Sequence, residues 1–383
     1  MSKIKKFLRD GLVHIFRCLG GLQNKVVFVS FGGKSYSDNP RAISEALHEL
    51  APSTKIVWLF KDGYENEKLP KYIVRVNATD TKAVLWHLAT SAAYVNNFLL
   101  NDFAKSKKQM FIQTWHGDKA FKKVLYDAAS FTGYAKEAVP GYCDLAIAGS
   151  EYGKKQYITA FRYVGRILME GTPRNDRLVH LDKLACEKIK KDLGISVQSR
   201  ILLYAPTLRK EQAENRQLQD VGQLNIGHML DLLEEKSGSS WVCLLRAHPS
   251  IVGLGGYKVD RRILDVTHYE DMADLLSVAD MLITDYSSCA GDFALLRRPI
   301  VLFQGDRHTY LEKDRDLYFN MEDSPYWVAE NESQMEQILS EFTPEAAEKN
   351  CEDILRFYGD VETGYASKRV AEEIINWIER RSK

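Results

Sequence analysis

Short apolar runs alternate with longer amphipathic segments along most of the chain. Runs of strand length lie at 26–31, 56–60, 72–76, 93–95, 110–114 and 143–148, then at 200–205, 241–245, 263–266, 281–284 and 299–303. Segments of helical character separate them, for example 41–50, 81–89 and 182–193. Strands that alternate with helices predict parallel sheets. The break Gly171-Thr-Pro-Arg-Asn-Asp176 divides the series, so we expect two α/β domains.

The domain boundaries follow from the same pattern. We expect a first α/β domain over 25–180, a second over 181–345, and a helical segment over 346–383. Within the last segment, residues 361–381 carry an aromatic and aliphatic stripe typical of a helix packed on the body of a protein. The polar stretch 211–224 is expected to be an exposed loop.

Residues 1–24 predict a basic amphipathic helix. Ile4, Phe7, Leu8, Leu12 and Ile15 recur at helical spacing among lysines and arginines. Such a helix can lie on an anionic membrane surface, and it can equally pack on the protein's own body; the pattern leaves both open. No stretch supplies the roughly 20 apolar residues that a membrane span needs, and no small-residue cleavage site follows the basic end.

Composition narrows the class of protein. The chain has 383 residues, of which 45% are apolar and 27% charged, as in ordinary globular proteins. Lys+Arg and Asp+Glu both number 52, so the overall charge gives no argument for nucleic acid as a partner. The six cysteines are scattered singly, which argues against structural zinc and fits a reducing cytosol.

A histidine follows one strand of the first domain. Gln113-Thr-Trp-His-Gly117 comes directly after an apolar run, and the basic segment 119–125 follows it. We expect a strand, a tight turn permitted by Gly117, and then a helix that points Lys119, with Lys122 and Lys123, toward a phosphate. The alternative is a surface turn with an incidental histidine.

Polar groups also follow three strands of the second domain. They lie in Ala205-Pro206-Thr207, in Arg246-Ala-His248-Pro, and in Thr284-Asp-Tyr-Ser-Ser288, where a helix over 289–296 is expected to have Ser287 or Ser288 as its cap and Asp292 in its first turns. Taken singly, each group has an ordinary structural explanation as a cap, a turn or a core residue. Their common position at the carboxyl ends of parallel strands, where α/β folds bind ligands, favours a phosphoester site.

Taken together, these motifs resemble a known family. Thr114-Trp-His-Gly117, Gly171-Thr-Pro-Arg-Asn-Asp176, Tyr204-Ala-Pro-Thr207, Arg246-Ala-His-Pro249 and Thr284-Asp-Tyr-Ser-Ser288 occur in the order seen in the CDP-glycerol glycerophosphotransferases, the teichoic-acid primases and polymerases. Gly33-Lys34 with Asp38-Asn-Pro40 also resembles that family's N-terminal turn. The resemblance implies a GT-B fold, with two Rossmann-like domains whose parallel sheets face each other across a cleft. It also implies that the helices over 346–383 pack back toward the first domain.

The resemblance also implies an activity. An acceptor hydroxyl would attack the β-phosphorus of a CDP-alditol, polyol phosphate would be transferred, and CMP would leave. The acceptor would be a lipid-linked or growing cell-envelope glycan of teichoic-acid or capsule type, reached by a cytoplasmic protein on the inner face of the membrane. No tightly bound cofactor is expected, and any Mg²⁺ would come with the nucleotide.

The family's residue roles carry over to matching positions. His116 would be the general base, and His248 is the second histidine assigned to the catalytic centre. The substrate-binding residues would be Trp115, Gly117, Asp118, Lys119, Arg174, Pro206, Thr207, Arg246, Ser287, Ser288 and Asp292. Asp118 departs from the Thr that many members carry, which leaves the alditol, glycerol or ribitol, open.

Two other classes of function remain open at this stage. A GT-B glycosyltransferase that uses a nucleotide sugar would need the same diphosphate site. The third possibility is a non-catalytic binding protein with a decayed site. The presence of both histidines and Arg246 argues against it.

Overall fold

The structure is a computed structural model that describes residues 3–66, 69–98, 104–128, 143–209, 224–248, 260–314 and 316–382. The chain forms two compact units. Unit 1 comprises residues 1–118, 130–176 and 361–383, and unit 2 comprises 119–129 and 177–360. Among the helices of these described ranges, none is both long enough and apolar enough to cross a membrane.

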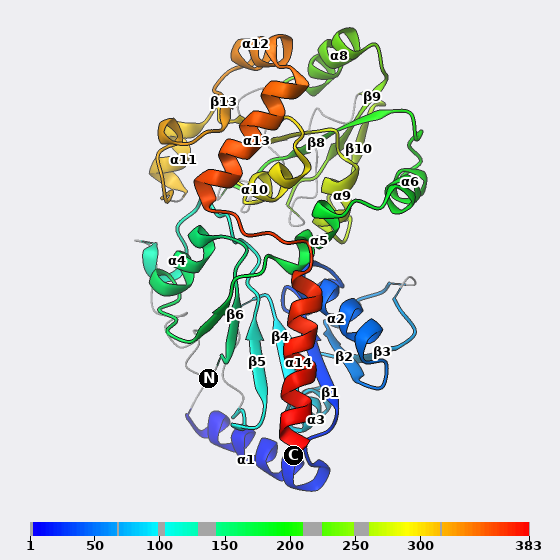
Figure 1. Ribbon diagram of the computed structural model, residues 1–383, viewed down its shortest axis with the longest axis vertical. Helices are drawn as coiled ribbons and strands as arrows, with labels where there is room; N and C mark the ends of the chain where they lie inside the picture. Colours follow the sequence, from blue (N-terminus) through cyan, green and yellow to red (C-terminus); the bar gives the residue numbers. More distant parts are fainter. Residues whose placement is uncertain are drawn as a thin grey trace. The chain divides into compact units, whose positions relative to one another are not determined.

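Unit 1 is built on a seven-stranded parallel sheet (Figure 1). Its strands are β1 (Lys25–Val29), β2 (Lys55–Phe60), β3 (Ile73–Asn77), β4 (Ala93–Asn96), β5 (Met110–Gln113), β6 (Leu145–Ile147) and β7 (Arg166–Leu168). Their order is β3-β2-β1-β4-β5-β6-β7, and every pair is parallel. The order reverses between β1 and β4, which is where Rossmann-type sheets bind ligands.

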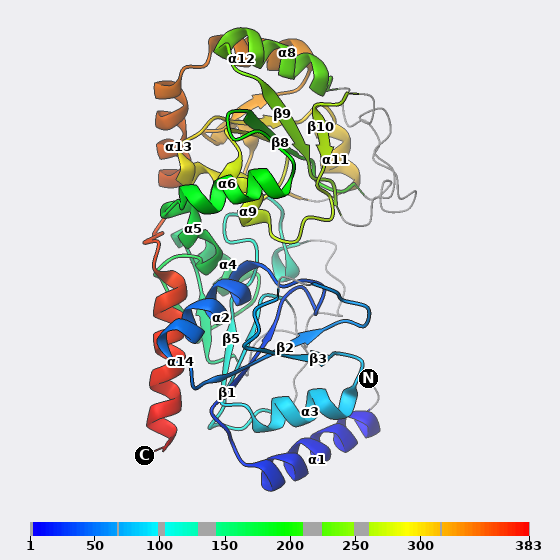
Figure 2. The same ribbon diagram turned by 90° about the vertical axis from the view of Figure 1, so that its right-hand side faces the viewer.

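Helices cover both faces of this sheet. Val26 and Phe28 of β1 point to one face, where they pack with α2 (Asp38–Leu50) and α14 (Ala366–Ser382). Val27 and Val29 point to the other face, which α3 (Thr81–Thr90) covers through Leu88. Figure 2 shows α14 running beside α2 in unit 1. Side chains of a strand alternate between faces, so the continuous apolar runs of the sequence match strands buried on both sides.

Only one side of the first helix, α1 (Lys3–Gly20), packs against the rest of unit 1. Val13 is fully buried with Leu85 and Ala89 of α3, and the Phe16 ring meets Trp86 edge-on at 5.6 Å. The guanidinium of Arg17 donates to the carbonyl oxygen of Ala104 at 2.9 Å. Apolar side chains on the rest of α1 stay exposed: Phe7, Leu8, Leu12, Ile15 and Leu19.

Unit 2 repeats the arrangement with six parallel strands. They are β8 (Arg200–Ala205), β9 (Trp241–Leu245), β10 (Ile263–Asp265), β11 (Met281–Thr284), β12 (Ile300–Phe303) and β13 (Trp327–Ala329). Their order is β10-β9-β8-β11-β12-β13, again parallel throughout, with the reversal between β8 and β11. The three strands 200–205, 241–245 and 281–284 have the predicted bounds.

The helices of unit 2 also lie against its sheet. They are α6 (Lys183–Asp192), α8 (Ile226–Ser237), α9 (Met272–Val278), α10 (Cys289–Phe293), α11 (Arg307–Lys313), α12 (Glu332–Glu341) and α13 (Pro344–Tyr358). Buried side chains of α8 and α12, such as Met229 and Met335, share one apolar cluster with strands β8 to β13.

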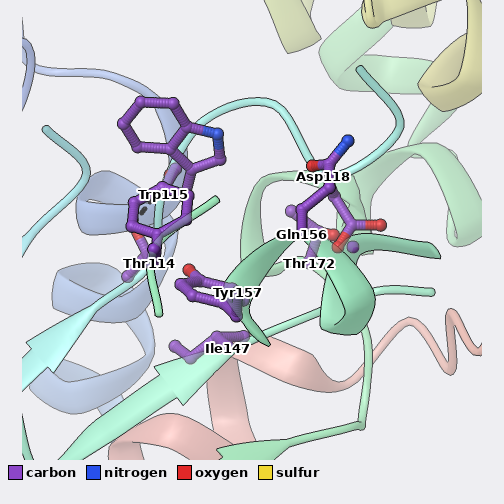
Figure 3. Close-up of a pocket in the computed structure, with 9 residues that line it drawn as sticks. Thr114, Trp115, Asp118, Ile147, Gln156, Tyr157 and Thr172 are labelled. Atoms are coloured by element: carbon purple, nitrogen blue, oxygen red, sulfur yellow. Dashed lines mark hydrogen bonds between the residues drawn. The ribbon is translucent and has the colours of Figure 1, made fainter. Parts of the chain in front are cut away.

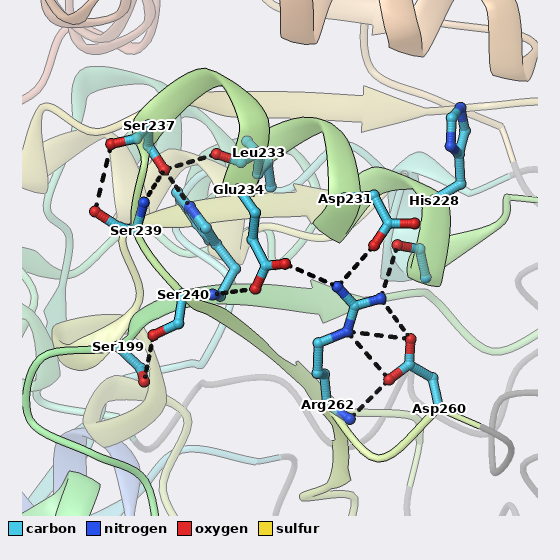
Figure 4. Close-up of polar contacts among 12 residues, drawn as sticks. Ser199, His228, Asp231, Leu233, Glu234, Ser237, Ser239, Ser240, Asp260 and Arg262 are labelled. Carbon is cyan, nitrogen blue, oxygen red and sulfur yellow. Dashed lines mark hydrogen bonds and ion pairs between the residues drawn. The ribbon is translucent and has the colours of Figure 1, made fainter.

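An ion network fastens α8 near the amino ends of β9 and β10. The Arg262 guanidinium bonds carboxylate oxygens of Asp231 at 2.8 Å, Glu234 at 3.1 Å and Asp260 at 2.8 Å (Figure 4). The backbone N–H of Trp241 donates to Glu234 at 2.9 Å. These groups lie at the opposite end of the strands from the predicted site, so we assign them to the scaffold.

The structure divides the expected C-terminal segment 346–383. Helix α13 lies in unit 2, where Ile354 and Tyr358 are buried, and the chain enters unit 1 only at Val361. Helix α14 supplies Val370 and Ile374 to the core of unit 1, so this helix alone makes the return. The short edge strands β7 and β13 were not expected, and the loop predicted over 211–224 falls outside the described residues except Leu224, which is buried.

Candidate active site

The turn after β5 is held in an unusual backbone conformation. Trp115, with φ of 52°, occupies the left-handed region, whereas Gly117, which we expected to permit the turn, does not. The Trp115 N–H donates to the side-chain oxygen of Gln113 at 2.9 Å, and its carbonyl accepts from the amide of Asn39 at 3.0 Å. A non-glycine residue in this region is held there by its surroundings, which is common at functional sites.

His116 follows the strained residue and lies among aromatic rings. Its ring centroid is 4.2 Å from that of Trp115, 5.3 Å from Phe31 and 5.8 Å from Phe98. Its Nδ1 atom lies 2.7 Å from the carbonyl oxygen of Asn97. A carbonyl oxygen can only accept, so Nδ1 carries the proton and Nε2 keeps a lone pair in the neutral ring. Burial lowers the pKa of His116, which favours that neutral form.

Polar residues from other strand ends of unit 1 surround this imidazole. The amide of Asn97 donates to Asp38 at 3.0 Å, and the Arg174 guanidinium lies 3.7 Å from the other oxygen of that carboxylate. The backbone N–H of Arg174 donates to Asn39 at 3.0 Å. The Asp38 carboxylate raises the pKa of His116, and Arg174 lowers it. The structure thus brings His116, Trp115 and Arg174 together.

Asp38, Asn39 and Asn97 were not predicted as site residues. The signal was present for Asn97, because Asn96-Asn97 ends the apolar run 93–95 at a strand's carboxyl end. Asp38 and Asn39 belonged to the Asp38-Asn-Pro40 motif but had no assigned role.

Asp118 is committed to the scaffold of unit 1. Its Oδ1 atom accepts from the backbone N–H of Gly149 at 2.9 Å, and its Oδ2 atom accepts from the Ser150 hydroxyl at 2.6 Å. Ser150 in turn caps α4 (Glu151–Thr159) by accepting from the N–H of Gly153. The Asp118 carboxylate therefore fastens the histidine turn to the start of α4.

The expected helix over 119–125 does not form. Lys119 is fully buried in unit 2, with its Nζ atom 2.9 Å from Oδ1 of Asp360, and the side chain of Phe121 is fully buried. Lys122 forms a β-bridge with Leu317. Burial of these side chains outweighs helix propensity, which is only a weak preference. Lys119 is thus not presented to a phosphate as expected.

In unit 2, the ends of β8 and β11 are bonded to each other. Thr207 donates its backbone N–H, at 2.9 Å, and its hydroxyl, at 2.5 Å, to the carboxylate of Asp285. Arg209 lies 2.8 Å from the same carboxylate and 2.7 Å from that of Asp306. Burial lowers the pKa of its guanidinium, but the two anions together raise that pKa above its usual value. Pro206 is buried beside Thr207. Asp285 therefore holds the backbone at the point where the strand order reverses.

Arg246 and His248 follow β9 as expected. The Arg246 guanidinium donates to the carbonyl oxygen of Tyr269 at 2.8 Å and is partly buried. Burial lowers its pKa, and the nearby carboxylate of Asp271 opposes this effect. His248 is exposed at the end of the described stretch 224–248. The pair thus combines a desolvated cation with an accessible imidazole.

The turn after β11 differs in detail from the expectation. Helix α10 spans only Cys289–Phe293, and a 3₁₀ turn continues it to Leu296. Ser288 occupies the cap position without a side-chain hydrogen bond, whereas the Ser287 oxygen accepts from the Cys289 N–H at 3.5 Å. Both serines are half-buried, and Asp292 is buried within α10. Among the described residues, no group of three or more His, Cys, Asp or Glu side chains could hold a metal ion.

Comparison with known proteins places the chain in a family. Residues 13–379 match the model of the CDP-glycerol:poly(glycerophosphate) glycerophosphotransferases. A teichoic acid glycerol-phosphate transferase of Staphylococcus aureus is 30% identical over 97% of this chain and 99% of its own length. A teichoic acid ribitol-phosphate primase of Bacillus spizizenii is 29% identical over 93% and 92%.

A solved structure has the same architecture. The wall teichoic acid polymerase TagF, in a variant soaked with CDPG, superposes with a TM-score of 0.82 at 25% identity and covers 100% of both chains. The fold is therefore GT-B, with two Rossmann-like domains. The chain spans 45% of the poly(glycerol phosphate) polymerase of Bacillus subtilis, to which it is 33% identical. This chain belongs to the CDP-glycerol:poly(glycerophosphate) glycerophosphotransferase family and is a polyol-phosphate transferase.

Proposed function

We propose that the chain transfers glycerol phosphate or ribitol phosphate from its CDP derivative to a hydroxyl of a lipid-linked or growing cell-envelope glycan, with His116 as general base. The observation that carries this proposal is the 2.7 Å contact between Nδ1 of His116 and the carbonyl of Asn97. It fixes the tautomer in which Nε2 can accept a proton. A base of this kind must be unprotonated before it acts, and burial keeps the ring neutral.

The proposed step balances without a cofactor. The acceptor hydroxyl gives its proton to Nε2 of His116 while its oxygen forms a bond to the β-phosphorus. The bond from that phosphorus to the bridging oxygen breaks, and CMP leaves with this oxygen. Stabilising the charge on the phosphoryl oxygens is the larger task in phosphoryl transfer, so cations must contact the diphosphate.

Arg246 and Arg174 are the proposed cationic contacts of the diphosphate. Arg246 is already desolvated, which strengthens its interaction with an anion. In unit 2, we propose that the CDP-alditol donor contacts His248, Pro206, Thr207, Ser287, Ser288 and Asp292. Trp115 and Gly117 are proposed to contact the end of the donor where transfer takes place. Asp118 instead supports the histidine turn by accepting from Ser150, and Lys119 instead pairs with Asp360 within unit 2. Any Mg²⁺ would arrive with the nucleotide.

The donor can be identified directly. Purified chain would be incubated with CDP-glycerol, CDP-ribitol or a UDP-sugar and a lipid-linked acceptor, and nucleotide release would be measured. We expect CMP from one CDP-alditol at a rate well above the other donors. Release of UDP without CMP would favour the nucleotide-sugar alternative, and absence of turnover with all donors would revive the non-catalytic one.

We also propose that α1 docks the protein on the anionic inner face of the membrane. Val13, Phe16 and Arg17 attach this helix to unit 1. Leu8, at 60% exposure, and Leu19, at 74%, lie on its remaining surface with Phe7, Leu12 and Ile15. Exposed apolar side chains on a basic helix fit the boundary between headgroups and acyl chains. Under this proposal both alternatives left by the sequence would apply, since one side of the helix packs on the body of the protein and the other would contact lipid.

A further inference from the structure

A small pocket lies beneath the histidine turn of unit 1. It is lined by Thr114, Trp115, Asp118, Ile147, Gly153, Gln156, Tyr157, Phe161 and Thr172 and contains about 250 Å³ of space, including the part open to solvent. Figure 3 shows Trp115, Thr114 and Tyr157 on one side and Gln156, Asp118 and Thr172 on the other. Its enclosed part has room for little more than one water-sized group, so the pocket suits a single hydroxyl rather than a nucleoside.

Two buried polar side chains of this pocket have no hydrogen-bond partner among the residues that the structure describes. Both the nitrogen and the oxygen of the Gln156 amide are unpaired, and so is the Thr172 hydroxyl. Each of these residues is only 3% exposed. Buried polar groups are nearly always paired, because an unpaired one loses its hydration without compensation. An amide and a hydroxyl left unpaired in one pocket therefore point to a ligand that can both donate and accept.

The rest of the lining defines the chemistry of that ligand. Asp118 contributes a carboxylate, and none of the described residues that line the pocket is a lysine or arginine, so a phosphate group would be repelled. Trp115, Tyr157 and Phe161 provide rings, with Trp115 and Phe161 edge-on at 4.8 Å. A neutral hydroxyl on a short carbon chain matches both the polar pair and the apolar walls.

Trp115 connects this pocket to the proposed base. Trp115 is one of the lining residues, and its ring centroid lies 4.2 Å from that of His116, the next residue. A hydroxyl-bearing group anchored in the pocket would therefore place its chain beside the imidazole. Unit 1 would then bind the acceptor and leave the nucleotide to unit 2.

We propose that Gln156 and Thr172 form a subsite for a terminal hydroxyl of the acceptor's polyol chain. This inference rests on the proposed function. Water has the same hydrogen-bonding chemistry as such a hydroxyl, so the experiment must separate the two sources.

The first test is a binding measurement that does not need turnover. Saturation-transfer NMR of the full chain with glycerophosphoglycerol, the two-glycerol phosphodiester, should show transfer to the terminal CH₂OH protons. Gln156→Leu and Thr172→Val should each remove most of that transfer. Thr159→Val, which removes an exposed hydroxyl from the same helix, should retain it. Equal transfer in all variants, or none in the wild type, would mean a water site and overturn the proposal.

The second test is kinetic. At saturating donor, Gln156→Leu and Thr172→Val should raise the acceptor KM about tenfold per lost hydrogen bond and leave the donor KM unchanged. A fall in kcat with an unchanged acceptor KM would contradict the subsite. If the wild type releases no CMP from any donor, the proposed function fails, and the NMR result alone still decides the hydroxyl site.

Discussion

The Nζ atom of Lys119 lies 2.9 Å from Oδ1 of Asp360, and the lysine side chain is fully buried. The Cβ and Cδ atoms of Lys119 also fill the space beside Gly291, where an added Cβ would lie 2.6 Å from the lysine. The lysine that followed the histidine motif in sequence is therefore a structural cation of unit 2.

Asp360→Asn should destabilise the protein. The change removes the carboxylate beside a buried ammonium, and losing one partner of a buried pair costs about 3–5 kcal/mol. Urea unfolding would measure the loss. As a control, Glu352→Gln breaks the exposed pair with Arg297, whose side chains are 45% and 47% exposed, and should cost less than about 1 kcal/mol. Equal midpoints for Asp360→Asn and the wild type would show that the pair is not structural.

Gly153→Ala should destabilise the protein although alanine is the better helix former. An added Cβ at this position of α4 would lie 1.9 Å from Oδ1 of Asp118, so the carboxylate would have to leave its bonds to Gly149 and Ser150. We expect a loss of about 2 kcal/mol or more in unfolding free energy.

Gly11→Ala in α1 is the matched control. No atom lies within 4 Å of the added Cβ, and the change should stabilise the protein by about 0.5–1 kcal/mol. A gain in stability at both positions would contradict the assigned role of Asp118.

Lys119 and Asp118 show which features of the fold could not be predicted from the sequence. The strands 200–205, 241–245 and 281–284 were predicted with their bounds because each is a continuous buried apolar run. The segment 119–125 was predicted wrongly, because its local pattern favours a helix while Asp360 and Leu317, far away in sequence, determine its structure.

Part of the candidate site could also be predicted from the sequence. A histidine at the end of β5 follows from the apolar run before it, but its partner is a backbone carbonyl, at Asn97, which no side-chain pattern reveals. The hydrogen bonds of Asp118 could not be predicted, because Gly149 and Ser150, which donate them, lie more than 30 residues away in sequence.

The pH profile should report the environment of His116. Burial lowers its pKa from the usual 6.5, so kcat/KM should stay constant near neutral pH and fall only as the pH drops well below 6.5. Asp38→Asn removes a carboxylate that raises this pKa, and should move the acidic limb to lower pH. Arg174→Gln removes a cation that lowers it, and should move the limb to higher pH. Shifts in the same direction for both variants would contradict this electrostatic picture.

The exposed side of α1 should determine lipid binding. Leu12→Ser with Ile15→Ser removes two exposed apolar side chains, each worth about 1.5–3 kcal/mol when fully buried, so binding should weaken at least tenfold. Co-sedimentation with phosphatidylglycerol vesicles would measure it. Leu184→Ser on α6, where the leucine is 76% exposed, should leave binding unchanged. If the double variant binds like the wild type, or the wild type does not bind, the membrane proposal is wrong.

The most direct test of the account replaces the base itself. His116→Asn keeps a polar side chain of similar size but cannot accept a proton, so kcat for CMP release from the preferred CDP-alditol should fall about 10²–10⁴-fold. The donor KM should change little, because we propose that unit 2 binds the nucleotide. CMP release by His116→Asn at the wild-type rate would contradict the assignment of His116 as general base.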